Sequence, residues 1–322
     1  MRFPLTWTPV LGVAMATVAL GAAAACGARS DISNDVATAD GSIDSFSRKD
    51  TGRDAPLPPI DVAPKPDVIR NDCPDAAATL IYVITTAYDL YSFNPPSGAF
   101  TRIGAIRCPS APNATPFSMA VDRKGVAYVL FDDGELFRVS NLTAACTDTG
   151  YFPGQVPSFL TFGMGFASDT NGPAETLYVA SDTNAASFGP SQIGKIDVTT
   201  FRLSPIGTFD SRVTNAELTG TGDGRLFAFY ATALNLSTAP TAIGEVDKGT
   251  GGLLAETPLP TVHLGNHWAF GFWGGDFYTF TGLNGSGTDV TRVRPSDGSV
   301  TVVGTLGEDI VGAGVSTCAP EL

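Results

Sequence analysis

Residues 117–152 read FSMAVDRKGVAYVLFDDGELFRVSNLTAACTDTGYF, four short apolar runs separated by the segments DRKG, DDG and NLTAA. Within the runs, apolar residues alternate with others, and β-branched and aromatic residues are enriched, as is typical of strands. The Asp and Gly residues between the runs are typical of tight turns. The stretch therefore predicts a four-stranded antiparallel meander, which cannot bury both of its faces alone and must stack against similar units.

Related units recur along the chain from Cys73 onwards. The unit at 80–106 lacks a first strand, whereas the later units are complete and begin near residues 117, 162, 216 and 268. The segment IVGAGVSTC at 310–318 matches a first strand and has no unit of its own. If this last strand completes the first unit, the chain closes into a ring, and the repeat length of about 45–54 residues suits the blades of a propeller.

We therefore predict an all-β fold, a single β-propeller of five four-stranded blades whose ring is closed by the C-terminal strand. A propeller of six blades is the alternative, because short strands could lie in the inserts at 170–175, 183–190 and 232–240.

Composition limits the classes of function. The chain has 322 residues, of which 43% are hydrophobic and 16% charged, so it can bury one or two sizeable cores. The formal charge of −13 argues against a nucleic-acid partner, because binding phosphates requires a basic face.

Residues 1–25 predict a secretory signal peptide, since an Arg near the start precedes an apolar run that is too short and too rich in Ala for a membrane span. The AAAC at 23–26 resembles the lipobox of bacterial lipoproteins, which implies a lipid on Cys26 that anchors the chain in a membrane. By the same resemblance, Gly27 favours the outer membrane. Ordinary cleavage after an A-x-A motif is the alternative, and the product would then be secreted or periplasmic.

Residues 26–72 consist mainly of Asp, Ser, Pro, Arg and Ala, with almost no aromatic residues. Such a segment buries too little apolar surface to offset the entropy of ordering it, so we expect a disordered linker. A linker of this length spans on the order of 40 Å. The propeller domain then occupies residues 73–322.

Four cysteines remain beyond Cys26, an even number that favours disulfides in an oxidising compartment. Among their three pairings, the expected ring favours Cys73 with Cys318, because Cys318 ends the closing strand and Cys73 precedes the strand that should pair with it. This bridge would stabilise the fold by roughly 4–5 kcal/mol in the chain-entropy model. Cys108 and Cys146 would then join neighbouring blades. A metal site is the alternative, although the sequence contains no C-x-x-C spacing.

Few side chains are candidates for function. His263 and His267 stand four apart, a spacing that suits a metal on a helix, but here they belong to a loop that leads into a strand. The residues that could reach a mouth of the central channel are Glu217, Asp169, His267 and Trp273.

The aspartates Asp122 and Asp223 are expected to satisfy backbone donors in the turns DRKG and GDG, whereas no turn requires Glu217. Paired carboxylates at a channel mouth could serve a glycosidase or a calcium-dependent lactonase. Trp273 ends the aromatic run WAFGFW, a stacking platform for sugar or peptide in one interpretation. Alternation sends Phe270 and Phe272 to the opposite face from Trp273, so at least one of these faces should belong to an inter-blade core.

The third strands of the units, DLYSFNPPSG, KIDVTTF, GEVDKGTG and RVRPSDG, resemble those of the YVTN, NHL and quinoprotein-like propellers. As a whole the chain resembles uncharacterised β-propeller lipoproteins of myxobacteria-like Gram-negative bacteria, a family that implies no established activity.

Two classes of function follow. The first is a non-catalytic, envelope-anchored scaffold that binds a protein or glycan, and small inner-strand residues such as Gly163 and Gly165 favour it because close approach of blades requires them. The second is a propeller hydrolase or lactonase with an acidic, calcium-dependent site at the channel mouth. We favour the first, and we assign no catalytic residue, metal ligand or cofactor.

Overall fold

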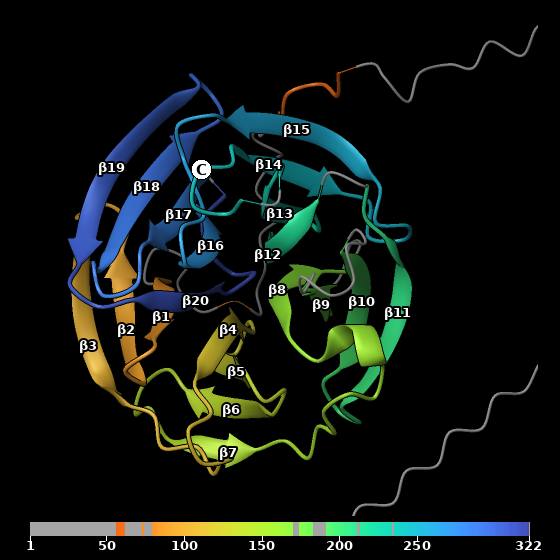
Figure 1. Ribbon diagram of the computed structural model, residues 1–322, viewed down its shortest axis with the longest axis vertical. Helices are drawn as coiled ribbons and strands as arrows, with labels where there is room; N and C mark the ends of the chain where they lie inside the picture. The colour runs from red at the N-terminus through yellow and green to blue at the C-terminus, as the bar shows by residue number, and fades with distance from the viewer. Residues whose placement is uncertain are drawn as a thin grey trace, which may run out of the picture. The chain divides into compact units, whose positions relative to one another are not determined.

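The computed structural model describes residues 56–61, 73, 79–169, 174–182, 191–210, 213–233 and 235–321. Their strands form five four-stranded antiparallel sheets around a common centre, which is the five-bladed β-propeller expected (Figure 1). The alternative of six blades is excluded for this part of the chain. The predicted signal peptide, Cys26 and most of the predicted linker lie outside the described residues.

Each blade runs from an inner strand at the centre to an outer strand at the rim (Figure 1). Blade one consists of β20 (Ile310–Val315), β1 (Ile81–Thr85), β2 (Asp89–Asn94) and β3 (Ala99–Ala105). Blade two consists of β4 (Pro116–Val121), β5 (Val126–Phe131), β6 (Leu136–Ser140) and β7 (Cys146–Asp148). Blade three follows a short 3-10 helix, η2 (Pro157–Phe159), and consists of β8 (Phe162–Ser168), β9 (Glu175–Ser181), β10 (Gln192–Asp197) and β11 (Arg202–Thr208).

Blade four consists of β12 (Thr214–Gly220), β13 (Leu226–Ala231), β14 (Thr241–Val246) and β15 (Leu253–Leu259). Blade five consists of β16 (His267–Trp273), β17 (Asp276–Gly282), β18 (Thr288–Arg294) and β19 (Ser299–Leu306). The inner strands β20, β4, β8, β12 and β16 contact their neighbours around the channel. We call the end of the channel where these strands begin the front mouth and the end where they finish the rear mouth.

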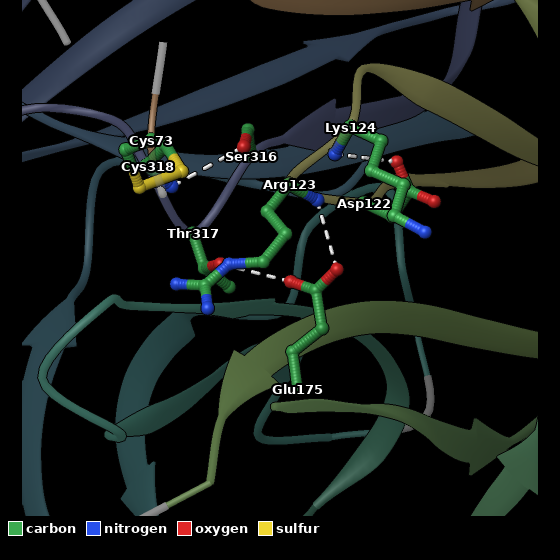
Figure 2. The surroundings of a disulfide bond; sticks show 8 residues. All are labelled: Cys73, Asp122, Arg123, Lys124, Glu175, Ser316, Thr317 and Cys318. Carbon is green, nitrogen blue, oxygen red and sulfur yellow. Dashed lines mark hydrogen bonds between the residues drawn. A yellow bond between two sulfur atoms is a disulfide. The ribbon is translucent and has the colours of Figure 1, made fainter. Parts of the chain in front are cut away.

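The ring closes through the C-terminal strand, as predicted. β20 pairs antiparallel with β1, with Ile81 opposite Val315. A disulfide then joins Cys73 to Cys318, 245 positions apart in sequence, with a Cα–Cα distance of 5.5 Å (Figure 2). A second disulfide joins Cys108 to Cys146. Both pairings are those that the ring topology favours, and they indicate an oxidising compartment outside the cytoplasm.

The cores lie between blades because each sheet buries both of its faces. On blade five, Phe270 and Phe272 pack with Phe227 and Phe229 of blade four. Trp273 points to the other face and packs against the core shared with blade one. Both faces of β16 therefore belong to inter-blade cores, which accounts for Phe270, Phe272 and Trp273 without a binding role.

Small residues allow the inner strands to approach one another. A Cβ atom on Gly163 of β8 would lie 2.1 Å from the carbonyl oxygen of Ala216 on β12. A Cβ atom on Gly314 of β20 would lie 2.7 Å from the backbone nitrogen of Val121 on β4. The inner-strand glycines are thus required by close packing around the channel.

A short part of the predicted linker is packed on the propeller. Residues 56–61 contact the rim of blade four, where the backbone N–H of Glu256 donates to the carbonyl oxygen of Pro58 over 2.9 Å. Ile60 is 4% exposed and belongs to the core between blades four and five. Among the described residues, none of the helices has the length and apolar character needed to span a membrane.

Candidate functional site

A cavity of about 180 Å³ opens at the front mouth of the channel, and we call it the front cavity. It is lined by Thr86, Thr115, Pro116, Phe117, Asp132, Glu217, Asn266, His267, Trp268 and Val311. The apolar part of this lining is aromatic, since Phe117 and Trp268 are both half-buried. The polar part includes the exposed residues Asp132 and Asn266, so the cavity offers both aromatic side chains and hydrogen-bonding groups.

Glu217 lies inside this cavity and crosses the channel. Glu217 is 4% exposed, and its Oε2 accepts a hydrogen bond from Ser118 Oγ over 2.9 Å. The backbone N–H of Met164 also donates to the carboxyl group. These partners come from the inner strands of blades two and three, whereas Glu217 comes from blade four. The carboxyl group therefore ties three inner strands together across the channel.

Burial controls the protonation of Glu217. Loss of solvation raises its pKa well above the ordinary value of 4.5, the two hydrogen bonds lower it by less, and the charge of Asp182 raises it further. Glu217 therefore keeps its proton at pH values where an exposed glutamate is ionised. A neutral carboxylic acid in a cavity can donate a hydrogen bond or a proton.

His267 begins β16 and lies beside the front cavity, but its polar contacts are structural. Its Nε2 is 3.2 Å from Thr288 Oγ1, and that hydroxyl donates to the carbonyl oxygen of Glu308. Since Thr288 has a single hydroxyl hydrogen, the imidazole donates to Thr288. Burial lowers the pKa of His267, which favours the neutral form of the ring.

The two histidines do not form a metal site. His263 Nδ1 lies 2.8 Å from the carbonyl oxygen of Ala239, a contact that fastens its own loop. Within the part of the chain that the structure describes, no group of three or more His, Cys, Asp or Glu residues could hold a metal ion.

The other two predicted site residues lie at the rear mouth. Asp169 follows the end of β8, where its Oδ1 accepts a hydrogen bond from Thr176 Oγ1 over 2.8 Å. Trp273 ends β16, and its Nε1 donates to the carbonyl oxygen of Thr79 over 2.7 Å. Glu217 and His267 thus meet at one mouth, while Asp169 and Trp273 are held at the other by structural hydrogen bonds.

The two turn aspartates have different partners. Oδ1 of Asp122 accepts hydrogen bonds from the N–H groups of Lys124 and Val126, over 2.9 and 2.8 Å. Asp223 forms an ion pair with Arg225 in its own turn, with 2.9 Å between Oδ2 and Nε. Asp122 therefore satisfies backbone donors as expected, whereas Asp223 contacts the side chains of Thr221 and Arg225.

A carboxylate that the sequence did not single out organises the rear mouth. Glu175 Oε1 accepts from the backbone N–H of Arg123, and Oε2 accepts from Thr317 Oγ1, both over 2.8 Å (Figure 2). Figure 2 shows this group of contacts beside the disulfide between Cys73 and Cys318. Glu175 thus joins blade three to the first turn of blade two and to the C-terminal segment.

A larger hollow of about 530 Å³ lies along β9, β10 and β11 of blade three. Its lining includes Lys195, Asp197 and Arg202, all exposed, together with Glu175. Because Glu175 already serves the contacts of the rear mouth, we regard the front cavity as the better candidate site.

Sequence reasoning missed most of the front cavity. Asn266 precedes His267 at the start of an inner strand, and Thr115 precedes the start of another, whereas Trp268 begins the aromatic run already considered as a stacking platform. A search for polar and aromatic residues at the beginnings of inner strands would have found them. Ser118 also lies on an inner strand, and its hydroxyl is the hydrogen-bond partner of Glu217.

No protein-family model matches the sequence, and no curated protein matches it. Among solved structures, the chain is similar to TolB from Acinetobacter baumannii, with 14% identity and a TM-score of 0.40 over 72% of this chain and 54% of that one. It is also similar to Zg3597, a family 117 glycoside hydrolase produced by Zobellia galactanivorans, with 10% identity and a TM-score of 0.43 over 72% and 77% of the two chains.

A protein of unknown function from Bacteroides caccae is similar over 74% of this chain and 98% of its own, with 9% identity and a TM-score of 0.38. The matched region spans only about half of the TolB chain. These likenesses are distant and concern the fold, so they carry no argument about activity.

Proposed function

We propose that this protein is a non-catalytic, envelope-anchored binding module. In this proposal a lipid on Cys26 anchors the chain, residues 26–72 act as a tether, and the propeller offers its front mouth to a protein or glycan partner. The two disulfides support export, and the resemblance of residues 23–26 to a lipobox, followed by Gly27, supports anchoring at the outer membrane.

The lining of the front cavity carries the proposal. Phe117 and Trp268 supply ring faces, and Asp132 and Asn266 supply hydrogen-bonding groups at the rim. A sugar ring presents an apolar face and several hydroxyls, so this combination suits a glycan. The volume of about 180 Å³ is smaller than the roughly 300–1,000 Å³ of ordinary small-molecule sites, and it suits one terminal sugar or one side chain of a partner.

A glycan array probed with the fluorescently labelled protein tests this proposal. We expect retention of a defined class of terminal sugar, and Trp268→Ala should weaken binding by about tenfold or more because the stacking surface is lost. Phe152→Ala is the matched control, because Phe152 is an aromatic residue that is 72% exposed and lies outside the cavity lining. A partner protein would be detected instead by a photocrosslinker at Asn266. Equal binding by the wild type and Trp268→Ala would exclude the front cavity.

Anchoring is tested separately. In cells that process lipoproteins, the wild type should sediment with membranes, whereas Cys26→Ser should appear in the soluble fraction. Soluble wild-type protein would exclude the lipid anchor and would leave the binding proposal standing.

A hydrolase or lactonase is the second candidate, and the raised pKa of Glu217 favours it. A buried carboxyl group that keeps its proton could act as a general acid in the cavity, with Asp132 as a second carboxylate in the same lining. The test is turnover of a panel of glycosides and lactones with and without calcium. Hydrolysis by the wild type that Glu217→Gln abolishes, while binding persists, would establish an enzyme. If the wild type hydrolyses none of these compounds, the hydrolase and lactonase proposal is rejected for this set of substrates.

A further inference from the structure

The outer strand of blade four carries a segment of the chain that is remote in sequence. Residues 56–61, PLPPID, lie beside β15 at the rim of the propeller, as the short orange segment in Figure 1 shows. The backbone N–H of Glu256 donates to the carbonyl oxygen of Pro58 over 2.9 Å. The backbone N–H of Ile60 donates to Thr257 Oγ1 over 3.4 Å. The segment thus bonds to the free edge of an outer strand.

Two apolar side chains three positions apart fasten this segment. Ile60 is 4% exposed and packs into the core between blades four and five. Leu57 packs against the core between blades three and four. Arg225 adds a polar contact, because its Nη1 donates to the carbonyl oxygen of Asp61 over 3.2 Å. The segment therefore straddles the outer edge of one blade and reaches both of its faces.

The chemistry of the edge suits a proline-containing peptide. Proline has no N–H, so Pro58 and Pro59 leave no backbone donor unsatisfied at the rim, while the Pro58 carbonyl still accepts from Glu256. Proline also restricts the free peptide to extended conformations, so less conformational entropy is lost on binding. On the strand itself, Pro258 removes a donor from the same edge, which disfavours pairing with an ordinary strand.

We propose that the rim of blade four is a binding surface for an extended peptide of the type apolar-Pro-Pro-apolar, and that residues 56–61 of the same chain occupy it as a releasable clasp. While it is closed, the clasp holds the predicted tether at blade four. When it is open, the 17 residues 56–72 become available to extend from Cys73, which adds up to about 55–60 Å of reach. The surface lies on an outer strand and is separate from the front cavity.

The test uses the full chain and a labelled peptide of residues 54–63, DAPLPPIDVA. In the variant Ile60→Asp, the charged side chain should leave its apolar site and free the rim. We expect this variant to bind the peptide at least about tenfold more tightly than the wild type, whose rim is already occupied. The peptide with Asp in place of Ile60 should not bind either protein. The variant Leu57→Asp should behave like Ile60→Asp.

Hydrogen exchange gives an independent readout. The amide of Glu256 should exchange at least about tenfold faster in Ile60→Asp than in the wild type, because its acceptor has left, while β13 stays protected. Val302→Asp is the control: it introduces the same charge on β19, where the side chain is 57% exposed, and both readouts should match the wild type.

Three results would overturn the proposal. Equal exchange of the Glu256 amide in the wild type and Ile60→Asp would show that the segment does not occupy the rim. Failure of Ile60→Asp to bind the peptide while circular dichroism shows an intact fold would show that the rim is no peptide site. A wild-type dimer that Ile60→Asp converts to a monomer would show that the segment binds between copies and not within one chain.

Discussion

Glu217→Gln should change how the stability of the propeller depends on pH. The amide has nearly the shape of a protonated carboxyl group, and its oxygen can still accept hydrogen bonds from Ser118 Oγ and the Met164 N–H. The substitution therefore removes one titrating group from a buried position with little change in packing. Any pH-dependent difference in the free energy of unfolding between the two proteins therefore reports on the proton of Glu217.

The sign of the effect follows from the raised pKa. In the unfolded chain Glu217 loses its proton near pH 4.5, whereas in the folded protein burial keeps the proton on to a higher pH. Between these two values the folded state binds one more proton than the unfolded state, so the free energy of unfolding falls as pH rises. The slope is at most about 1.4 kcal/mol per pH unit. The glutamine variant does not lose stability in this way. Its free energy of unfolding, relative to that of the wild type, should therefore rise above pH 4.5 and level off beyond the folded-state pKa.

Urea unfolding of both proteins with their disulfides intact, at half-unit steps from pH 4 to pH 8, measures the difference directly. Asp289→Asn is the control because it removes an exposed carboxylate on β18, and its effect should show no comparable rise with pH. A difference between the wild type and Glu217→Gln that stays flat from pH 4.5 to pH 8 would refute the assignment of a retained proton to Glu217.

Two further predictions concern closure of the ring and the close packing of its inner strands. Replacing Cys73 and Cys318 by Ser should lower the free energy of unfolding by up to about 5 kcal/mol, the upper end of the chain-entropy range for so long a loop, and urea midpoints measure it. A loss below about 1 kcal/mol would show that pairing of the terminal strands closes the ring without the bridge. Gly163→Ala should cost about 1–3 kcal/mol, because its Cβ would meet the Ala216 carbonyl oxygen, whereas Gly307→Ala, with no atom within 4 Å, should be neutral.

The architecture could be predicted because its signals are local and repeat. Alternation and turn residues define each strand pair over a few positions, and a leftover strand at 310–318 required a partner in the incomplete first unit. The ring topology in turn selected the pairing of Cys73 with Cys318. Each of these inferences needed only short-range patterns and the rule that sheets bury their faces.

The site could not be predicted in the same way because its contacts are long-range. Glu217 and Ser118 are 99 positions apart and lie on inner strands of blades that are not neighbours. The direction of the inner strands would have improved the prediction. His267 and Trp273 begin and end the same seven-residue strand, so they are about 20 Å apart and must face opposite mouths.

The packing of residues 56–61 was missed for a different reason. Averaged over 26–72, the composition indicates disorder, and the prolines strengthen that indication. Docking depends on two side chains, Leu57 and Ile60, which find apolar sites on blade four. A compositional average over a long segment does not detect a short anchored stretch within it.

Under the proposed function, the two mouths of the channel have different roles. At the rear mouth, Glu175 accepts hydrogen bonds from the Arg123 N–H and from Thr317 Oγ1, close to the closing disulfide (Figure 2). Burial raises the pKa of Glu175, so ionising this carboxyl group in the folded protein is costly. Substitutions of Glu175 that remove its hydrogen bonds should therefore lower the stability of the fold. At the front mouth, Asn266 is exposed and Trp268 half-buried at the start of one strand. If the proposed binding role is correct, substitutions of these two residues should alter binding without breaking the contacts that close the ring.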